Sequence, residues 1–271
     1  MSSTTSTAYT FDNSTRDARD QVQHLAGILD PHTFAVLDDL ALPARAVCAD
    51  LGAGAGTVAA RLAERTGPDG HVVVIDLQPQ HVPTHPRITI RQQDLVTADL
   101  EPDSFDLIHA RLLLMHLGQR EQILHKLAAA LKPGGAMVIS DWATDHLDDM
   151  FVDGPDPIRE VFSAFQHTMI AVCEGNGMDS TWARRVPAVM RQAGLTGIRG
   201  ETYNRLWNAG EPGMALHASN SRQLEPALLD AGMTRDQLAL LRDAMTAPKT
   251  PSKVMARSWP MHTTVGFRPA A

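Results

Sequence analysis

The sequence predicts an α/β fold: a Rossmann-like doubly wound sheet with an N-terminal helical cap and C-terminal, mostly helical lid insertions. Two observations carry the sheet. Short runs that are apolar on both faces alternate with helix-like runs between residues 45 and 142, as in parallel strands covered by helices. A glycine-rich turn follows the first apolar run. After residue 142 helical periodicity prevails, which predicts the lid.

The first predicted element is the helical cap, residues 1–44. Apolar side chains recur at helical spacing from Arg16 to Leu42. Asp30-Pro31 interrupts this stretch, and because proline has no N–H to donate, we expect two helices here rather than one. Tyr9 and Phe11 precede the helices and are expected to help complete the lid.

The central region, residues 45–142, predicts the core of the sheet, and residues 143–271 predict the remaining strands with the lid. Core strands are expected at 46–51, 71–77, 87–94, 105–110 and 136–142, and core helices at 57–66 and 120–132. Beyond the core we expect helices at 158–174, 181–194 and through most of 210–248, with strands at 197–207 and 263–267.

Composition limits the classes of partner. The chain has 271 residues and a net charge of −7 without a Lys/Arg-rich run, which disfavours DNA and RNA. Its two cysteines, Cys48 and Cys173, form no disulfide framework, and Cys48 is expected to be a buried structural thiol. The first residues lack an apolar signal core, and no apolar run approaches the roughly 18 residues of a membrane span. We therefore expect a cytoplasmic protein, compatible with a homodimer.

Three glycines, Gly52, Gly54 and Gly56, stand on alternate positions between the first strand and the first core helix. Such a loop faces the positive end of the helix dipole and lets the backbone approach a ligand closely. A dinucleotide site prefers Gly-x-Gly-x-x-Gly, and here the third glycine comes one place early. The alternative is a glycine-rich turn without a ligand.

Two acids favour a ligand. Asp76 ends the second strand, 20 residues beyond Gly56, where a carboxylate can accept hydrogen bonds from both hydroxyls of an adenosine ribose. Asp94 closes the third strand and could accept from an adenine amino group. Because ligands of open α/β sheets bind at the carboxyl edge of the strands, the loop and both acids predict one crevice.

With DLGAGAG (50–56), VVVIDL (72–77), QQDL (92–95), FDLIHARLLLMHL (105–117) and LKPGGAMVISD (131–141), the chain resembles class I S-adenosylmethionine-dependent methyltransferases. It is most similar to small-molecule enzymes of the actinobacterial, natural-product type. The resemblance implies S-adenosylmethionine as cofactor, with S-adenosylhomocysteine as its product. It also implies a cofactor site built from Asp50, Gly52, Gly54, Gly56, Asp76, Leu77, Asp94, Leu95, His109 and Arg111.

Within that implied site, the glycine backbone passes under the methionyl part and Asp76 holds the ribose. Leu77, Asp94 and Leu95 surround the adenine. His109 and Arg111 border the sulfonium end, where Arg111 either pairs with the cofactor carboxylate or is an exposed arginine at a helix start.

The implied reaction is methyl transfer to a small organic acceptor in specialised metabolism, with an oxygen acceptor preferred. One alternative is a natural-product enzyme that binds the cofactor and catalyses a non-methylating reaction such as cyclisation. A nicotinamide oxidoreductase is a further alternative, which the glycine spacing disfavours.

Candidate catalytic residues are His167, Asp141 and His116. A histidine suits a general base near neutral pH, and Asp141 ends the fifth strand at the crevice. Core packing is the alternative for His116 and a solvated helix position for His167, while His217 and His262 are weaker candidates. We predict no metal, although acids cluster from Asp141 to Asp149, because metal-dependent relatives take an aspartate from the end of the fourth strand, which here reads IHAR.

Large apolar residues of the predicted lid suggest how the acceptor is recognised. As a set they predict a lid over an apolar or aromatic acceptor, the alternative being ordinary packing between lid helices. They are Phe162, Phe165, Met169, Trp182, Trp207 and Met214.

Overall fold

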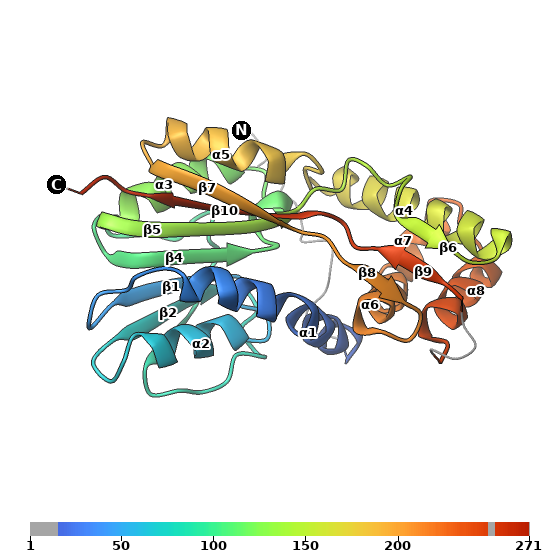
Figure 1. Ribbon diagram of the computed structural model, residues 1–271, viewed down its shortest axis with the longest axis horizontal. Coiled ribbons are helices and arrows are strands. Elements are labelled where there is room, and N and C mark those ends of the chain that lie inside the picture. The colour runs from blue at the N-terminus through green and yellow to red at the C-terminus, as the bar shows by residue number, and fades with distance from the viewer. Residues whose placement is uncertain (1–15, 249–252, 271) are drawn as a thin grey trace, which may run out of the picture.

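The computed structural model describes residues 16–248 and 253–270, and its centre is a seven-stranded sheet in the order β3-β2-β1-β4-β5-β10-β7 (Figure 1). β1 to β5 are parallel, and β10 runs antiparallel to both of its neighbours. This order confirms the predicted Rossmann-like fold. The strands are β1 Val47–Leu51, β2 His71–Asp76, β3 Ile88–Gln92, β4 Phe105–Arg111, β5 Leu131–Trp142, β7 Thr196–Tyr203 and β10 Met261–Phe267.

Helices cover both faces of this sheet because its strands alternate apolar side chains between the faces. On one face, α2 (Thr57–Arg65) buries Val58 and Leu62 in a cluster with strand residues such as Val72. On the other face, α3 (Arg120–Ala130) and α5 (Trp182–Gln192) pack in a cluster that includes Val73 and Ile108. Each fully buried aliphatic side chain contributes about 1.5–3 kcal/mol, so these clusters fix the sheet and its helices together.

The N-terminal cap is one helix, α1 (Arg16–Asp38), with Pro31 inside it. The expectation of two helices is therefore wrong. Residues on both sides of the proline are buried, among them Leu29 and Leu37, each with no exposed surface. Their burial outweighs the roughly 3 kcal/mol that an interior proline costs a helix. Tyr9 and Phe11 lie outside the described residues.

A second group of elements lies beside the end of the sheet toward which β4 points (Figure 1). Its helices are α4 (Asp156–Gly175), α6 (Pro212–Gln223), α7 (Glu225–Asp230) and α8 (Arg235–Thr246). They accompany a small antiparallel sheet in the order β6-β9-β8, formed by Phe151–Asp153, Met255–Arg257 and Leu206–Asn208. The predicted strand at 197–207 is thus two strands, β7 and β8, which belong to different sheets. β6 and β9 were not predicted.

Cys48 is buried, as expected, and burial raises the pKa of its thiol to about 12. Cys173 is buried as well, and neither cysteine forms a disulfide. In the part of the chain that the structure describes, every helix is too short or too polar to cross a membrane.

Candidate active site

A cavity of about 490 Å³ lies at the carboxyl ends of β1, β2 and β4, with α1 along one side. This volume falls within the range of small-molecule sites. Every predicted cofactor-binding residue except Gly56 lines the cavity. Those that do are Asp50, Gly52, Gly54, Asp76, Leu77, Asp94, Leu95, His109 and Arg111.

The glycine loop supplies the floor of this cavity. Gly52, Gly54 and Gly56 have φ values of 63°, 54° and 73°, in the left-handed region that favours glycine. A Cβ on Gly54 would find only Val22 within 4 Å, at 3.9 Å, so its backbone is open to the cavity. A Cβ on Gly56 would lie 2.6 Å from Pro83 Cδ. Gly56 therefore allows close packing of the 82–83 segment on the start of α2, a correction to its predicted place in the cavity wall.

Asp76 is held at the end of β2 with its carboxylate at the cavity. Its Oδ1 accepts a hydrogen bond from the Gln78 N–H at 2.7 Å, and its Oδ2 accepts a longer one from the Gly54 N–H at 3.4 Å. Its residual exposure is 9%, and burial raises its pKa. Because a carboxylate has about four acceptor positions, two backbone bonds leave capacity for a ligand.

The segment after β3 forms the next wall. Asp94 Oδ1 accepts the Val96 N–H at 2.9 Å, and Leu95 is buried. Lys126 of α3 donates to the carbonyls of Leu95 and Ala98 at 2.7 and 2.8 Å, fixing this turn. The sequence analysis missed Lys126, because nothing in an amphipathic helix reveals which distant carbonyls a lysine reaches. Leu77, 56% exposed, adds an apolar surface at the rim.

Asp50 and His109 form a buried pair across β1 and β4. They occupy paired positions in the strand register, and Asp50 Oδ1 lies 2.8 Å from His109 Nδ1. Their outer atoms, Asp50 Oδ2 and His109 Nε2, are buried and have no hydrogen-bond partner among the described residues. Buried polar atoms normally have partners, so these two atoms on a cavity wall fit the polar end of a ligand.

Arg111 lines the cofactor cavity and is not the exposed arginine that one of the two alternatives expected. Its side chain is only 13% exposed, Nη1 donates to Thr33 Oγ1 at 2.8 Å, and Nη2 pairs with Asp30 Oδ1 at 2.9 Å. Both partners belong to α1. Arg111 therefore holds α1 against the end of β4, and its guanidinium is already paired.

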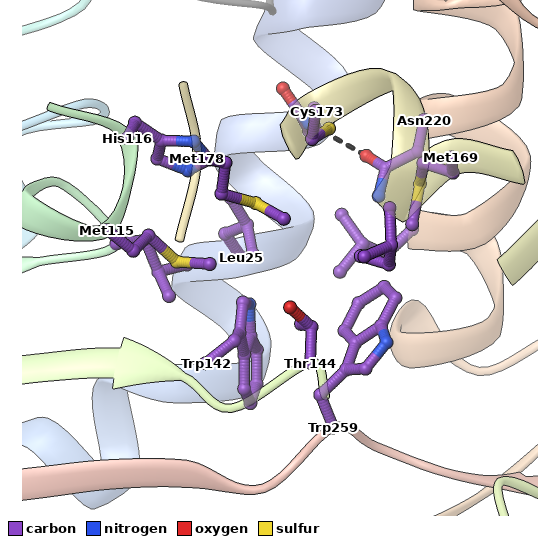
Figure 2. A pocket seen from close by; sticks show the side chains of 14 residues that line it. Leu25, Met115, His116, Trp142, Thr144, Met169, Cys173, Met178, Asn220 and Trp259 are labelled. Atoms are coloured by element: carbon purple, nitrogen blue, oxygen red, sulfur yellow. Dashed lines mark hydrogen bonds between the residues drawn. The ribbon is translucent and has the colours of Figure 1, made fainter. Parts of the chain in front are cut away.

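A second, apolar cavity of about 70 Å³ adjoins the first (Figure 2). Gln21, Leu25 and Leu112 belong to the walls of both. Trp142 and Trp259 stand side by side at its base in Figure 2, with their ring centroids 5.8 Å apart. The remaining apolar walls come from three methionines and from aliphatic side chains, and the polar ones are Gln21, His116, Thr144 and Asn220.

One hydrogen bond closes this second cavity between α1 and α6. Gln21 Nε2 donates to Asn220 Oδ1 at 2.7 Å, and the bond is buried. Of the predicted lid residues, only Met169 lines the cavity. Packing is the correct reading for the other five, which are Phe162, Phe165, Trp182, Trp207 and Met214.

Among the catalytic candidates, His116 lies on the wall of the apolar cavity, within the short 3-10 helix Leu114–His116. Burial, with a smaller effect of Arg120, lowers its pKa to about 4. The imidazole is therefore neutral near pH 7 and can accept a hydrogen bond.

His167 lines neither the cofactor cavity nor the apolar cavity, so the structure does not place it at the reacting group of an acceptor. It is exposed on α4, its Nδ1 lies 2.9 Å from the carbonyl oxygen of Ser163 in the preceding turn, and its Nε2 lies 3.5 Å from Asp148. It borders a separate polar groove. His217 is enclosed by aromatic rings, and His262 lies beside Thr202 at 3.2 Å, so neither lines the two cavities.

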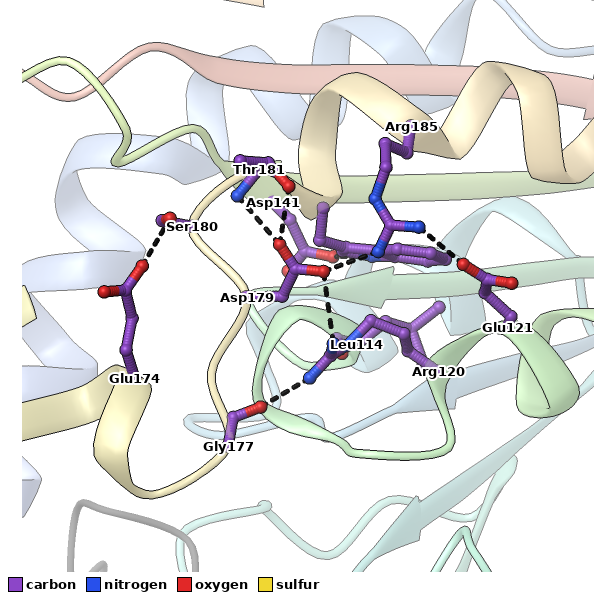
Figure 3. A network of polar contacts seen from close by, with 11 residues as sticks. Leu114, Arg120, Glu121, Asp141, Glu174, Gly177, Asp179, Ser180, Thr181 and Arg185 are labelled. Carbon is purple, nitrogen blue, oxygen red and sulfur yellow. Dashed lines mark hydrogen bonds and ion pairs between the residues drawn. The ribbon is translucent and has the colours of Figure 1, made fainter. Parts of the chain in front are cut away.

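Asp141 lines neither cavity, which corrects its assignment as base or acceptor anchor. Its Oδ1 accepts the Leu113 N–H and its Oδ2 accepts the Trp182 Nε1–H, both at 3.1 Å. Burial raises its pKa to about 8, against the opposing effect of these donors. Figure 3 shows Asp141 behind Asp179, which pairs with Arg120 at 3.2 Å and Arg185 at 2.5 Å. This network fixes the segment that carries Met178 of the apolar cavity.

Comparison with known proteins gives the class. Residues 49–137 match the family model of the methyltransferase domain. The phosphoethanolamine N-methyltransferase of Plasmodium falciparum is 24% identical over 149 residues, which are 52% of this chain and 54% of that protein. The chain spans between 26% and 54% of the length of five curated relatives that it matches.

Two solved structures share the fold. A Haemonchus contortus phosphoethanolamine N-methyltransferase 2, in complex with phosphomonomethylethanolamine and S-adenosylhomocysteine, has a TM-score of 0.57 and 15% identity, covering 95% of this chain and 59% of that one. The cyclase SpnF has a TM-score of 0.50 and 15% identity, covering 89% of this chain and 81% of that one.

Residues 49–137 thus match a methyltransferase domain, and the fold around them is that of the class I S-adenosylmethionine-dependent methyltransferases. The Haemonchus contortus structures that share this fold contain S-adenosylhomocysteine or S-adenosyl-L-methionine.

Proposed function

We propose that the chain transfers a methyl group from S-adenosylmethionine to a small organic acceptor whose reacting group enters the apolar cavity. The observation that carries the proposal is the shared wall of the two cavities, formed by Gln21, Leu25 and Leu112. A methyl donor in one cavity and an acceptor in the other would meet at these residues. Proximity of this kind removes a large entropic part of the barrier of a two-substrate reaction.

The residues of the larger cavity fit the cofactor. Asp76 would accept from the ribose hydroxyls, and Asp94 and Leu95 would contact the adenine. The open backbone of Gly54 and the orphan atoms of Asp50 and His109 would face the methionyl end. When bound, the cofactor supplies a methyl group that is already activated on a sulfonium.

The chain itself contributes orientation, exclusion of water and a hydrogen-bond acceptor. α1, held by Arg111 and by the bond from Gln21 to Asn220, covers the junction of the two cavities. The neutral imidazole of His116 can accept a hydrogen bond from an acceptor hydroxyl in the apolar cavity. We therefore prefer an oxygen acceptor, and on the sequence motifs alone we place the reaction in specialised metabolism.

A phosphorylated acceptor is disfavoured, although two relatives are phosphoethanolamine N-methyltransferases. Phosphate sites in proteins use arginine, lysine or helix N-termini. Among the described residues that line the apolar cavity there is neither arginine nor lysine.

The test is an assay of the full chain with S-adenosylmethionine labelled in its methyl group and a panel of small phenols, aromatic alcohols and amines. We expect at least one labelled product, formed in equal amount with S-adenosylhomocysteine, and its loss in Asp76→Ala. A product that gains no methyl mass, with no S-adenosylhomocysteine formed, would instead support the cyclase alternative. Binding of a reduced nicotinamide cofactor in place of S-adenosylmethionine would support the oxidoreductase.

A further inference from the structure

A polar groove of about 500 Å³ shares wall residues with the apolar cavity and none with the cofactor cavity. It runs along the loop after β5 and along α4. Thr144 and Ile170 belong to the walls of both the groove and the apolar cavity, so the two adjoin. The three spaces therefore follow one another: the cofactor cavity, the apolar cavity and the groove.

The size of the apolar cavity argues that an acceptor extends beyond it. Sites for drug-sized molecules measure about 300–1,000 Å³, whereas this cavity measures about 70 Å³. It accommodates the reacting part of an acceptor but not a whole molecule of that size. With the cofactor in its own cavity, the adjoining space left for the rest of the acceptor is the groove.

The hydroxyl of Thr144 marks the junction between the apolar cavity and the groove. Thr144 is 3% exposed, and its Oγ1 has no hydrogen-bond partner among the described residues. Its backbone N–H is bound to the Ser180 carbonyl at 3.0 Å, which fixes its position. In Figure 2 Thr144 lies between the two tryptophans, and its oxygen points toward the apolar cavity. A buried hydroxyl without a partner is costly, so a ligand group at this point would satisfy it.

The groove carries an excess of negative charge. Its walls include the carboxylates of Asp145, Asp148, Asp149 and Glu174, but no arginine or lysine among the described residues. Arg184 neutralises Asp145 from outside the wall, at 3.1 Å. The Glu174 carboxylate accepts a hydrogen bond from a neutral donor, the Ser180 hydroxyl, at 2.5 Å. A wall of one charge sign attracts ligands of the opposite sign.

The arrangement suits an organic cation. In the part of the chain that the structure describes, no group of three His, Cys, Asp or Glu side chains is placed to hold a metal ion. The carboxylates are spread along the groove. An aliphatic ammonium group can pair with Asp149 or Glu174, and it would share Asp148 with His167, whose Nε2 lies 3.5 Å from that carboxylate.

We infer that the acceptor is an amphiphilic amine. Its apolar part with the reacting group occupies the apolar cavity against Trp142 and Trp259, a polar group beside that part bonds Thr144 Oγ1, and its ammonium group lies in the groove among Asp148, Asp149 and Glu174. The inference rests on the proposed function, because it assigns the substrate class of the same site.

The experiment compares two probes of equal shape on the full chain saturated with S-adenosylhomocysteine. 3-Amino-1-phenylpropan-1-ol carries the ammonium group, and the alcohol 1-phenylpropane-1,3-diol carries a hydroxyl in its place. Both have a hydroxyl beside the ring that can bond Thr144 Oγ1, and isothermal titration calorimetry gives Kd for each. We expect the amine to bind about fivefold tighter, as a few exposed ion pairs would give. This advantage should shrink as sodium chloride is raised, because the groove is open to solvent.

Variants locate the effect. In the double variant Asp149→Asn/Glu174→Gln we expect the affinity for the amine to fall to that for the alcohol. The Kd of the alcohol should stay unchanged. Both residues are exposed, so the fold should tolerate the changes. Asp243→Asn, an exposed acid on α8, is the matched control and should keep the preference. Thr144→Val should weaken both probes, and Thr144→Ser should restore them.

Equal affinity of the two probes, no binding of the amine, or a preference that survives the double substitution would overturn the inference. Binding of S-adenosylhomocysteine, measured first in the same titration, tests the cofactor site separately. If the chain binds S-adenosylhomocysteine normally but shows no preference for the amine, the proposed function is retained and the inference of an amine acceptor is rejected.

Discussion

At the scale of single residues, Asp141 shows how a buried acid can serve the site without touching it. Its two oxygens accept from Leu113 and Trp182, both at 3.1 Å. Leu113 belongs to the segment after β4, residues 112–117, which lines both cavities. Asp141 is therefore a positioning residue that acts through this segment.

The substitution Asp141→Asn tests this role. The amide nitrogen cannot accept a hydrogen bond, so one N–H donor loses its partner, and we expect unfolding free energy to fall by about 1–3 kcal/mol. S-adenosylhomocysteine should bind more weakly as the segment loosens. Urea unfolding and calorimetry at neutral pH measure the two effects. Unchanged stability and affinity, together with a large loss of turnover, would return Asp141 to the role of a catalytic base.

The sequence located the acids of the site better than it located their partners. Asp50, Asp76 and Asp141 were all predicted at the carboxyl edge, and all lie there. Which of them face the cavity depends on contacts distant in the chain, such as Trp182, which is 41 residues from Asp141. For Asp50, the strand register with β4 supplies His109 as a partner. A single sequence does not contain that register.

At the scale of elements, α1 is the part that joins the sheet to the lid. It is tied to β4 through Arg111 and to α6 through the buried bond from Gln21 to Asn220. Gln21 also lies in the walls of both cavities. The position of α1 should therefore control both ligand sites.

We predict that Gln21→Leu lowers the unfolding free energy by about 1–3 kcal/mol, because the carbonyl of Asn220 loses its donor in a buried position. Affinity for S-adenosylhomocysteine should fall as well. Gln23→Leu, on an exposed position of the same helix, is the matched control and should change neither quantity. If the two variants behave alike, the hydrogen bond between α1 and α6 has no closing role.

Elements with strong periodicity were predicted well, and short ones were not. Strands of the central sheet can be predicted because the sequence shows them as apolar runs between helices. β6 and β9 are three residues each and pair across about a hundred positions, which no local pattern reveals. α1 continues through Pro31 because burial on both sides of it outweighs a local rule.

At the scale of the whole molecule, a buried histidine in the lid should make stability depend on pH. His217 is fully buried among aromatic rings that include Phe162 and Trp259, at centroid distances of 5.2 and 4.9 Å. Burial lowers its pKa from 6.5 to about 3. Between pH 6.5 and about 3, His217 therefore binds a proton in the unfolded chain but not in the folded chain. The stability that is present above pH 6.5 is lost as the pH falls toward 3.

His217→Phe should reduce this acid sensitivity. Wild type should lose about 1.4 kcal/mol more than the variant when the pH falls from about 7.5 to about 5.5, since one such group contributes about 1.4 kcal/mol per pH unit. The variant also leaves Gln166, 3.2 Å from His217 in wild type, without that partner, so its stability at neutral pH should be lower. Urea unfolding at both pH values measures the difference, and parallel losses in the two proteins would contradict it.

The central claim for the whole molecule is that the cavity at the carboxyl edge of the sheet binds S-adenosylmethionine through the carboxylate of Asp76. Calorimetric titration of S-adenosylhomocysteine into wild type, Asp76→Ala and Asp69→Ala tests it most directly, because Asp69 precedes the opposite end of the same strand. We predict binding to wild type and to Asp69→Ala, and a loss of roughly 10- to 150-fold in Asp76→Ala, the value of hydrogen bonds to a charged group. No binding to wild type, or equal binding to all three proteins, would contradict the claim.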